Sequence, residues 1–373
     1  MNVVSFFSGA GGMDLGFCLA GHNIIWSNDF DEYAVSTYNQ NIAGKLNHEA
    51  LCCDIVKLLD CDRNAINEII PDCDIIIGGF PCQGFSIANL NRSMEDDKNF
   101  LYLQLLKAIS VKQPPYFLLE NVKGLENMEG GKVLDMILDD LSSAGTKSSK
   151  LFPSDGVGYT VVYNVLNAYN FGVPQNRERV IILGVRNDID NPVVRSHIGN
   201  KKRTRKNLLV KNTHSIDSNC KETQTPFEKV NKMYEQWKKG KPVLEQNCAT
   251  IFSAKTVRDA IFDLPRDYDL INYKNHVGSK CKVKITGYVG NRKTAWDKPS
   301  PTIMGRGSGT GGPLLPPHPD LHRRITVREA ARIQTFPDDF FFEGPISACY
   351  RQIGNAVPVL LAYNIAKIFV QEY

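Results

Sequence analysis

The first half of the chain alternates short apolar runs with amphipathic helical patterns, and this rhythm limits the fold more than any other feature. Strands are expected at 3–7, 24–27, 75–78, 116–119, 160–166 and 180–185, and helices at 13–20, 32–41 and 101–112. Strands that alternate with helices indicate an α/β fold with a mainly parallel sheet. From about residue 188 the sequence turns polar and rich in Lys, Asn and Thr, which indicates a second, smaller domain.

With 373 residues, 42% of them hydrophobic, the chain is long enough for one large core and a smaller one. No apolar run approaches the roughly 20 residues of a membrane span, and the N-terminus has no signal-peptide pattern. The ten cysteines show no CxxC pair and no zinc spacing. We therefore expect a cytoplasmic protein with free thiols, no metal and no membrane contact.

Positive charge is concentrated in one segment of the chain. Between Arg195 and Lys241 there are thirteen Lys or Arg residues and four Asp or Glu residues, although the whole chain carries a net charge of only +4. The aromatic residues Phe227, Tyr234 and Trp237 lie in the same segment. This composition suits contact with the phosphates of a nucleic acid, and the alternative is a solvated insertion.

Cys82 lies in the sequence Phe80-Pro81-Cys82-Gln83, directly after the apolar run Ile75–Gly79. In an open α/β sheet, ligands bind beyond the carboxyl ends of the parallel strands, so this thiol is expected at the working edge of the sheet. A single free cysteine is more often a small buried residue than a nucleophile. Its importance therefore depends on the other residues at that edge.

A glycine cluster, Phe7-Ser8-Gly9-Ala10-Gly11-Gly12, follows the first expected strand. Asp14 stands where a dinucleotide fingerprint has its third glycine, and no P-loop lysine follows, so a pyrophosphate or triphosphate ligand is disfavoured. Asp29 ends the second expected strand and can accept hydrogen bonds from ribose, while Phe30 can stack on a base. These residues favour S-adenosylmethionine as the cofactor. The alternative is a glycine-rich turn with no ligand.

Two further groups of residues are expected at the same edge. Glu120 leaves the apolar strand 116–119, where a carboxyl group is suited to proton donation. Arg177 and Arg179 precede the strand 180–185 and are expected to point the same way as each other. They are suited to binding a carbonyl oxygen, a phosphate or Glu120. The alternative for the arginines is a surface ion-pair ladder.

The order of the motifs resembles that of the bacterial cytosine-5 DNA methyltransferases. The matching segments are FSGAGG, SNDF, CDI, GGFPCQGFS, LLENVKG, QNRERV, TVREAARIQTFPDDF and YRQIGNAVPV. The resemblance covers residues 1–187 and about 290–373. The stretch between them is the one that varies in this family and reads the DNA sequence, and here it contains the basic segment.

The resemblance implies a role for each matching residue. Cys82 would add to C6 of a cytosine flipped out of the duplex, and Glu120 would hold and protonate N3. Arg179, with Arg177, would bind the O2 side and orient Glu120. A mobile loop over about 84–93 would close over the base. The base that removes the C5 proton is not identified, and water is a candidate.

The resemblance also implies a binding site for S-adenosylmethionine, with S-adenosylhomocysteine as the product. Asp29 would bind the ribose, in place of the Glu that is common there, and Phe30 would cover the adenine. The other implied contacts are Phe7, Gly9, Ala10, Gly11, Gly12 and Met13 at the methionine moiety, Asp54 and Ile55 at the adenine edge, and Leu101 and Asn355 completing the pocket.

Residues 1–187 and 345–373 are expected to form the catalytic domain, and 188–344 the target-recognition domain and hinge. Helix 359–369 would pack back on the N-terminal part. The expected substrate is double-stranded DNA with a short palindromic site. The first strand begins at once, which favours a prokaryotic or phage modification enzyme, active as a monomer, with a restriction endonuclease as a candidate partner.

Other functions fit the sequence less well. A tRNA methyltransferase of the same fold would carry a Cys-Phe-Thr signature, which is absent. A catalytically dead relative would not need Cys82, Glu120 and both arginines. A nicotinamide oxidoreductase is disfavoured by Asp14, and a cysteine hydrolase lacks a histidine near the motifs at the sheet edge.

Overall fold

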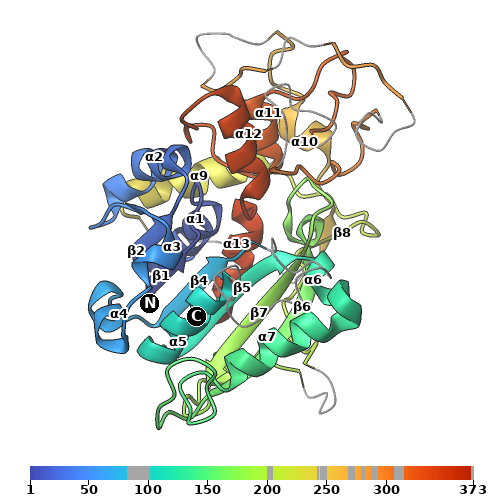
Figure 1. The fold of residues 1–373 in the computed structure, drawn as a ribbon. Coiled ribbons are helices and arrows are strands. Elements are labelled where there is room, and N and C mark those ends of the chain that lie inside the picture. Colours follow the sequence, from blue (N-terminus) through green and yellow to red (C-terminus); the bar gives the residue numbers. More distant parts are fainter. Residues whose placement is uncertain are drawn as a thin grey trace.

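The computed structural model describes residues 1–81, 101–199, 205–241, 243, 250–267, 274–278, 282–286, 293–305 and 315–370. Within these residues, the main sheet has seven strands in the order β3-β2-β1-β4-β5-β7-β6 (Figure 1). The strands are β1 (Asn2–Phe6), β2 (Asn23–Asp29), β3 (Leu51–Cys52), β4 (Ile75–Gly79), β5 (Tyr116–Val122), β6 (Tyr159–Asn167) and β7 (Glu178–Arg186).

The sheet is parallel from β3 to β5, and its last two strands are antiparallel. β1 pairs in parallel with β2 and β4, and β4 with β5, whereas β7 runs antiparallel to both β5 and β6. The predicted mainly parallel α/β fold is therefore confirmed. The reversal of β7 places its first residues beside the last residues of β5, with Arg179 opposite Val122.

Two hydrophobic clusters cover the two faces of the sheet. Side chains of consecutive strand residues point to opposite faces, so Val3 joins the cluster with α1 (Gly12–Leu19) and Val4 joins the cluster with α5 (Tyr102–Lys112). Both valines are fully buried. Burial on both faces explains why these strands are continuous apolar runs rather than alternating ones.

The remaining helices of the first half connect and cover the strands. They are α2 (Glu32–Asn41), α3 (Ile55–Leu58), α4 (Arg63–Ile69), α6 (Gly124–Asn127) and α7 (Lys132–Ser142). Asp31 caps α2 by accepting hydrogen bonds from the backbone N–H groups of Tyr33 and Ala34, which fixes where this helix starts after β2. Short 3-10 helices lie at Ala43–Lys45, Met128–Gly131, Ala168–Phe171 and Lys367–Phe369.

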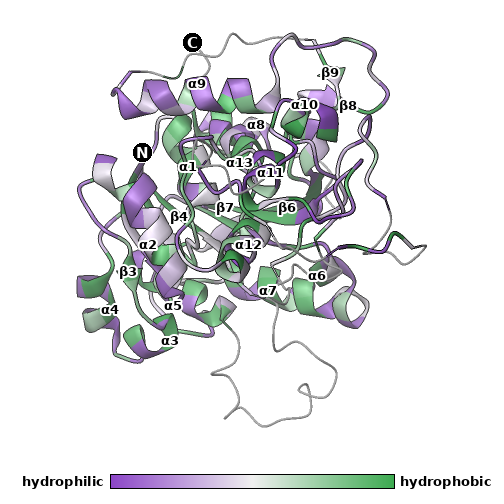
Figure 2. Ribbon diagram, turned by 90° about the horizontal axis from the view of Figure 1, so that it is seen from above, coloured by the Kyte–Doolittle hydropathy of each residue, from purple (hydrophilic) through white to green (hydrophobic). Residues whose placement is uncertain are grey.

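The C-terminal helix returns to the N-terminal part of the chain. α13 (Val359–Ala366) packs along α1, where Gly16 lies directly against Ala362. The expected packing of helix 359–369 on the N-terminal part is therefore observed. Figure 2 shows hydrophobic residues on the inner strands β6 and β7, with the outer α9 (Pro226–Lys238) more hydrophilic.

The second half contains α8 (Pro192–Ser196), α10 (Val257–Ile261), α11 (Val327–Ile333), α12 (Ile346–Asn355) and a two-stranded parallel sheet of β8 (His214–Ser215) and β9 (Phe252–Ser253). α9 packs against α1, and its residues Val230 and Met233 belong to the same core cluster as α1 and α13. Part of the polar segment is thus anchored on the sheet domain, because one face of α9 is apolar.

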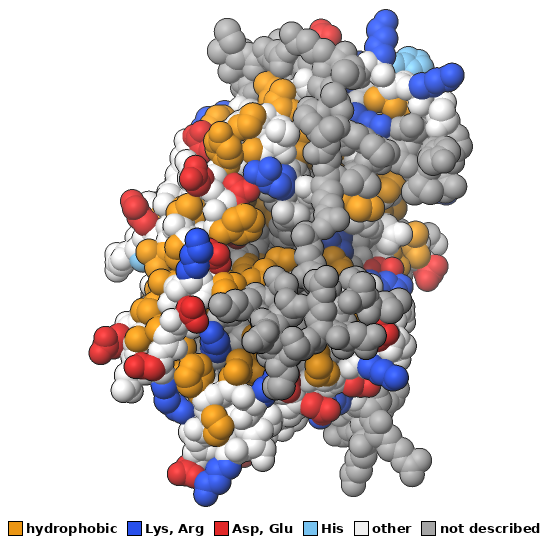
Figure 3. Space-filling view, viewed as in Figure 1, with side chains coloured by type: hydrophobic (Ala, Val, Ile, Leu, Met, Phe, Trp, Pro, Cys, Tyr) orange, Lys and Arg blue, Asp and Glu red, His pale blue; other side chains and the backbone are white. Residues whose placement is uncertain are grey.

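Several basic side chains of this segment have carboxylate partners. Arg205 pairs with Asp139 and Lys206 with Glu126, at N···O distances of 2.8 and 2.6 Å. Lys and Arg side chains lie among Asp and Glu on the face shown in Figure 3. The charge surplus seen in the sequence is therefore partly offset by acidic residues from other parts of the fold.

No helix in the described part of the chain is long and apolar enough to cross a membrane.

Candidate active site

Glu120 and Arg179 form an ion pair at the carboxyl end of the parallel strands. Arg179 Nε donates to Glu120 Oε1 at 2.7 Å, and the two side chains are only 11% and 10% exposed. Glu120 lies near the end of β5 and Arg179 near the start of β7, so the antiparallel pairing brings them together. A pair so shielded from water is weakly screened, and it fixes the orientation of the carboxylate.

The neighbouring strand leaves room for this carboxylate. Gly79 is the register partner of Glu120, and a Cβ atom at Gly79 would lie 3.0 Å from Glu120 Oε2. Asn121 Nδ2 donates to the carbonyl oxygen of Phe80 at 2.9 Å, which ties the end of β5 to the segment that leads into Cys82. Asn121 was not among the predicted site residues, although its place directly after Glu120 could have indicated it.

Cys82 itself, and the expected loop 84–93, lie outside the described residues. The described residues beside them are Phe80, which is buried, and Pro81, which is half-buried. The structure therefore places Gly79, the last residue of β4 and three residues before Cys82, beside the Glu120 carboxylate.

Arg177 is placed differently from Arg179. Its side chain is 1% exposed, and its guanidinium donates to the carbonyl oxygens of Ile303, Gly354 and Ala356 at 2.7, 2.8 and 3.0 Å. Burial lowers the pKa of Arg177 well below its ordinary value. Arg177 precedes the first residue of β7, so strand alternation does not govern its direction, and it makes no hydrogen bond with Glu120.

A buried amide pair extends the contacts of Arg177. Gln175 Nε2 donates to Gln334 Oε1 at 3.0 Å, and Gln175 Oε1 accepts from the backbone N–H of Ile303 at 3.0 Å. Gln334 Nε2 in turn donates to the carbonyl oxygen of Ile353 at 2.7 Å. Both glutamines are fully buried, and together with Arg177 they join residues 175–177 to residues 303, 334 and 353–356. Neither glutamine was among the predicted site residues.

The glycine cluster forms a tight turn between β1 and α1. Phe7, Gly9 and Gly11 all have positive φ angles, of 55°, 54° and 88°. Gly11 is the N-cap of α1, and a Cβ atom there would collide with Ile42. A left-handed non-glycine residue such as Phe7 is uncommon and is often found at functional sites. Ala10 and Met13 are buried beneath the turn.

The turn lies against the C-terminal motif. A Cβ atom at Gly12 would collide with the carbonyl oxygen of Val357, so glycine permits this close approach. Asn355 ends α12 two residues before Val357, and its side chain is exposed. The structure thus brings the glycine turn against the segment that directly follows Asn355, while the Asn355 side chain lies against Gly305.

Asp29 is bound to the same turn. Its Oδ2 accepts from the backbone N–H of Gly9 at 2.8 Å and its Oδ1 from that of Asp31 at 3.0 Å. Burial raises the pKa of Asp29 despite these hydrogen bonds. Phe30, next to it, is 73% exposed, so its ring is free to cover a planar ligand.

Asp54 lies farther along the edge and caps α3 by accepting from the backbone N–H of Val56 at 2.9 Å, while Ile55 is buried. A cavity of about 400 Å³ opens beside Asp54 and is lined on its other side by Leu103 and Gln104 of α5. Leu101 precedes α5 and is half-buried. Asp54 and the first turn of α5 are therefore near one another.

Comparison with known proteins identifies the family. Residues 1–371 match the family described as C-5 cytosine-specific DNA methylase. The chain belongs to this family. It is 34% identical to the type II methyltransferase M.BsuRI of Bacillus subtilis over 98% of this chain and 78% of that protein. It is 33% identical to M.NgoFVII of Neisseria gonorrhoeae over 100% of this chain and 88% of that protein.

The fold has also been seen in solved structures. The crystal structure of the Dnmt2 methyltransferase of S. pombe superposes with a TM-score of 0.58 and covers 99% of this chain and 98% of that one, at 18% identity. At this identity the similarity concerns the fold alone. The resemblance noted in the sequence is thus confirmed, and the chain is a DNA (cytosine-5-)-methyltransferase of the type II restriction-modification kind.

C-5 cytosine methylases use S-adenosylmethionine, and the turn at Phe7–Met13 is the candidate place for it. Among the residues that the structure describes, no group of three or more His, Cys, Asp or Glu side chains is arranged to hold a metal ion. The nicotinamide oxidoreductase and cysteine hydrolase alternatives are set aside by the family match.

Proposed function

We propose that this methylase modifies cytosine within a short double-stranded DNA sequence through a covalent bond between Cys82 Sγ and C6 of the base. The observation that carries this proposal is the 2.7 Å pair of Glu120 and Arg179 beside the strand end that leads to Cys82. A shielded carboxylate held by a guanidinium beside a thiol is the set of groups that activation of a pyrimidine ring requires.

In this mechanism each side chain handles a defined atom. The Cys82 thiolate adds to C6, and the electron pair of the C5–C6 bond makes C5 nucleophilic. Glu120 supplies a proton to N3 as negative charge develops on the ring, while Arg179 holds Glu120 Oε1 and leaves Oε2 toward Gly79. After methyl transfer a base, for which water is the candidate, removes the proton at C5. The C5–C6 double bond re-forms as the C6–S bond breaks, Cys82 leaves as a thiolate, and N3 returns its proton to Glu120.

S-adenosylmethionine, when bound, supplies an electrophilic methyl group for C5. The residues present fit this cofactor, because open space surrounds the Cβ position of Gly9 and the aromatic ring of Phe30 is exposed beside Asp29. We propose that Asp29 holds the ribose and Phe30 the adenine face. The other proposed contacts are Phe7, Ala10, Gly12, Met13, Asp54, Ile55, Leu101 and Asn355.

Arg177 contributes through the fold in this proposal. It holds the backbone at Gly354 and Ala356, on either side of Asn355, and at Ile303. The backbone on both sides of Asn355 is thereby fixed, and the Asn355 side chain lies against Gly305. Arg177 is therefore proposed as a positioning residue, and Arg179 as the residue that acts on the base and on Glu120.

Residues 188–344 are proposed to read the target sequence, with 1–187 and 345–373 as the catalytic domain. Side chains that enter the major groove would select the bases, and Lys and Arg would contact phosphates. We also propose that the protein acts as a monomer in a prokaryote or phage. A restriction endonuclease of the same specificity is its proposed partner. The type II relatives support it.

The proposal is tested with duplex DNA that contains 5-fluorocytosine. Fluorine at C5 cannot be removed as a proton, so the enzyme should remain covalently attached after methyl transfer. A complex that resists denaturing gel electrophoresis is expected with the unmodified protein and S-adenosylmethionine. Cys82→Ser should form none, and Glu120→Gln should form it much more slowly. A complex of equal yield with Cys82→Ser would refute the assigned nucleophile.

A further inference from the structure

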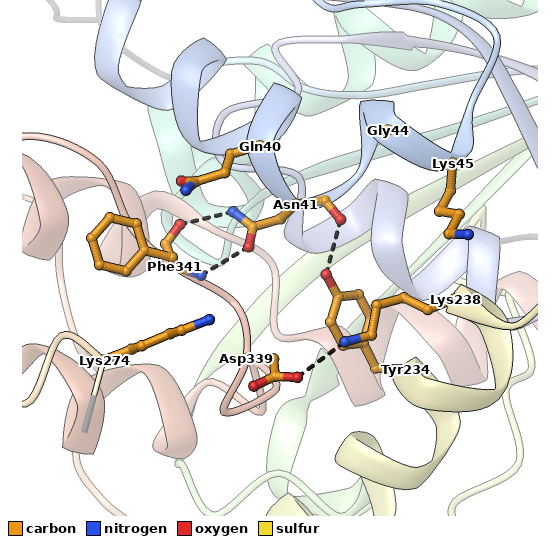
Figure 4. Close-up of a pocket in the computed structure, with 9 residues that line it drawn as sticks. All are labelled: Gln40, Asn41, Gly44, Lys45, Tyr234, Lys238, Lys274, Asp339 and Phe341. Carbon is orange, nitrogen blue, oxygen red and sulfur yellow. Dashed lines mark hydrogen bonds and ion pairs between the residues drawn. The ribbon is translucent and has the colours of Figure 1, made fainter. Parts of the chain in front are cut away.

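A second cavity, of about 350 Å³, lies between the end of α2, α9 and residues 339–341. Figure 4 shows its lining side chains, and none of the residues assigned to methyl transfer is among them. Lys45, Lys238 and Lys274 contribute to its wall together with Asp339. The cavity is therefore separate from the candidate active site.

Hydrogen bonds between distant segments hold the cavity in shape. The Tyr234 hydroxyl donates to the carbonyl oxygen of Asn41 at 2.9 Å. Asn41 Nδ2 donates to the carbonyl oxygen of Phe341, and its Oδ1 accepts from the Phe341 N–H, both at 2.8 Å. Tyr234 is buried, so these contacts are protected from water. The cavity is thus built into the fold rather than formed by mobile surface side chains.

Its charge is unbalanced in favour of cations. Three lysines and one carboxylate line it, and Lys238 Nζ pairs with Asp339 Oδ2 at 3.0 Å. This hydrogen bond lowers the pKa of Asp339, and the charge of Lys274 acts in the same direction.

Within the described part of the chain, neither Lys45 nor Lys274 has a carboxylate or hydrogen-bond acceptor for its ammonium group. In Figure 4 the Lys274 ammonium group points toward the space above Asp339. Two positive charges therefore remain available to a ligand.

We propose that this cavity binds a phosphate group and that the backbone of nucleic acid supplies it. A phosphate offers several acceptor oxygens to ammonium donors that approach from different directions, and the side-chain amide of Gln40 lines the same space. Lys45 and Lys274 are both exposed, so a polymer backbone has access to them. The enzyme acts on a polyanion, which favours this source over free phosphate.

The cavity also connects the two halves of the chain. Lys45 belongs to the N-terminal half, whereas Lys274 belongs to the region expected to read the DNA sequence. A phosphate held by both would add a contact to the duplex outside the active site. It would contribute affinity without sequence preference, because phosphates carry no base information.

The test uses the full chain and the double variant Lys45→Gln/Lys274→Gln. The matched control is Lys232→Gln/Lys239→Gln, which removes the same charge from an exposed position of α9 and from the exposed residue that ends it, neither of which lines the cavity. The affinity for a duplex is measured across a series of salt concentrations. Loss of one phosphate contact should reduce the slope of log affinity against log salt by about 0.9. The rate at saturating DNA should not change.

Binding of inorganic phosphate, followed by phosphorus NMR, distinguishes the two sources. A reduced salt slope and lost phosphate binding in the cavity variant, with neither change in the control, would establish a backbone contact. If the cavity variant loses phosphate binding but keeps the salt slope of DNA affinity, the cavity is a site for free phosphate, and the contact with the DNA backbone is refuted. If the cavity variant matches its control in both measurements, the proposal is wrong.

Discussion

The two arginines of the QNRERV motif should respond to mutation in different ways. In Arg177→Met, the buried carbonyl oxygens of Ile303 and Gly354 lose their charged donor, while the methionine refills the apolar volume. The partly buried carbonyl oxygen of Ala356 also loses it but keeps a hydrogen bond from Gln334 Nε2 at 3.3 Å. A buried unsatisfied acceptor costs about 1–3 kcal/mol. With two buried acceptors left without a donor and the third weakened, we expect a total loss of about 3–5 kcal/mol in the free energy of unfolding.

This loss converts to a measurable shift in melting temperature. An unfolding entropy of about 2 cal/mol/K per residue over 373 residues gives roughly 0.8 kcal/mol/K. Arg177→Met should therefore melt about 4–6 °C below the unmodified protein. Arg177→Lys retains the charge but not the several N–H donors of the guanidinium. Its melting temperature should lie between those of Arg177→Met and the unmodified protein.

Activity separates the two roles. Well below its melting temperature, Arg177→Met should keep its rate of methyl transfer within about tenfold of the unmodified protein. Arg179→Met removes the partner of Glu120, and we expect its rate at saturating DNA to fall by about 10²–10³. The reasoning is refuted if Arg177→Met melts normally and loses as much activity as Arg179→Met.

Three further predictions follow from individual contacts. Gly79→Ala places a Cβ atom 3.0 Å from Glu120 Oε2 and should lower kcat/KM at least about tenfold in a methyl-transfer assay, whereas Gly44→Ala, with open space around it, should not. Phe30→Ala should weaken binding of S-adenosylmethionine about tenfold by calorimetry without changing the melting temperature of the free protein, because the ring is exposed. Burial raises the pKa of Asp14 to about 7 from 3.8, so the folded state holds a proton that the unfolded state releases. Stability from this group is complete below pH 3.8 and is lost as the pH rises to about 7. Relative to Asp14→Asn, the free energy of unfolding of the unmodified protein should fall by about 1.4 kcal/mol per pH unit in that window, as measured by urea unfolding. Parallel plots of unfolding free energy against pH for the two proteins would contradict this prediction.

Local features of the site could be predicted from the sequence, and long-range ones could not. The turn at Gly9 and Gly11 follows from residues that need positive φ, and Glu120 follows from the end of an apolar run. The direction of β7 is not set locally, since its apolar sequence fits a parallel or an antiparallel neighbour equally well. Because β7 runs antiparallel to β5, Arg179 near the start of β7 lies beside Glu120 near the end of β5.

The separation of Arg177 from Arg179 and the docking of α9 share the same physical reason. Both depend on partners more than a hundred residues away, such as Gly354 for Arg177 and Asn41 for Tyr234. The aromatic residues of the basic segment suggested contact with nucleic acid. Phe227, however, lies beneath the Arg332 guanidinium at 4.0 Å from its ring centroid, so it contributes to packing within the protein.

Bisulfite sequencing of a mixed-sequence plasmid, treated with the protein and S-adenosylmethionine, tests the central claim most directly. The unmodified protein should leave methylated cytosines confined to one short motif, and Cys82→Ser, run beside it, should leave none. Methylation of the same sites by folded Cys82→Ser would contradict the proposed nucleophile. No methylation of DNA by the folded, unmodified protein, with methyl transfer to tRNA instead, would contradict the assigned substrate.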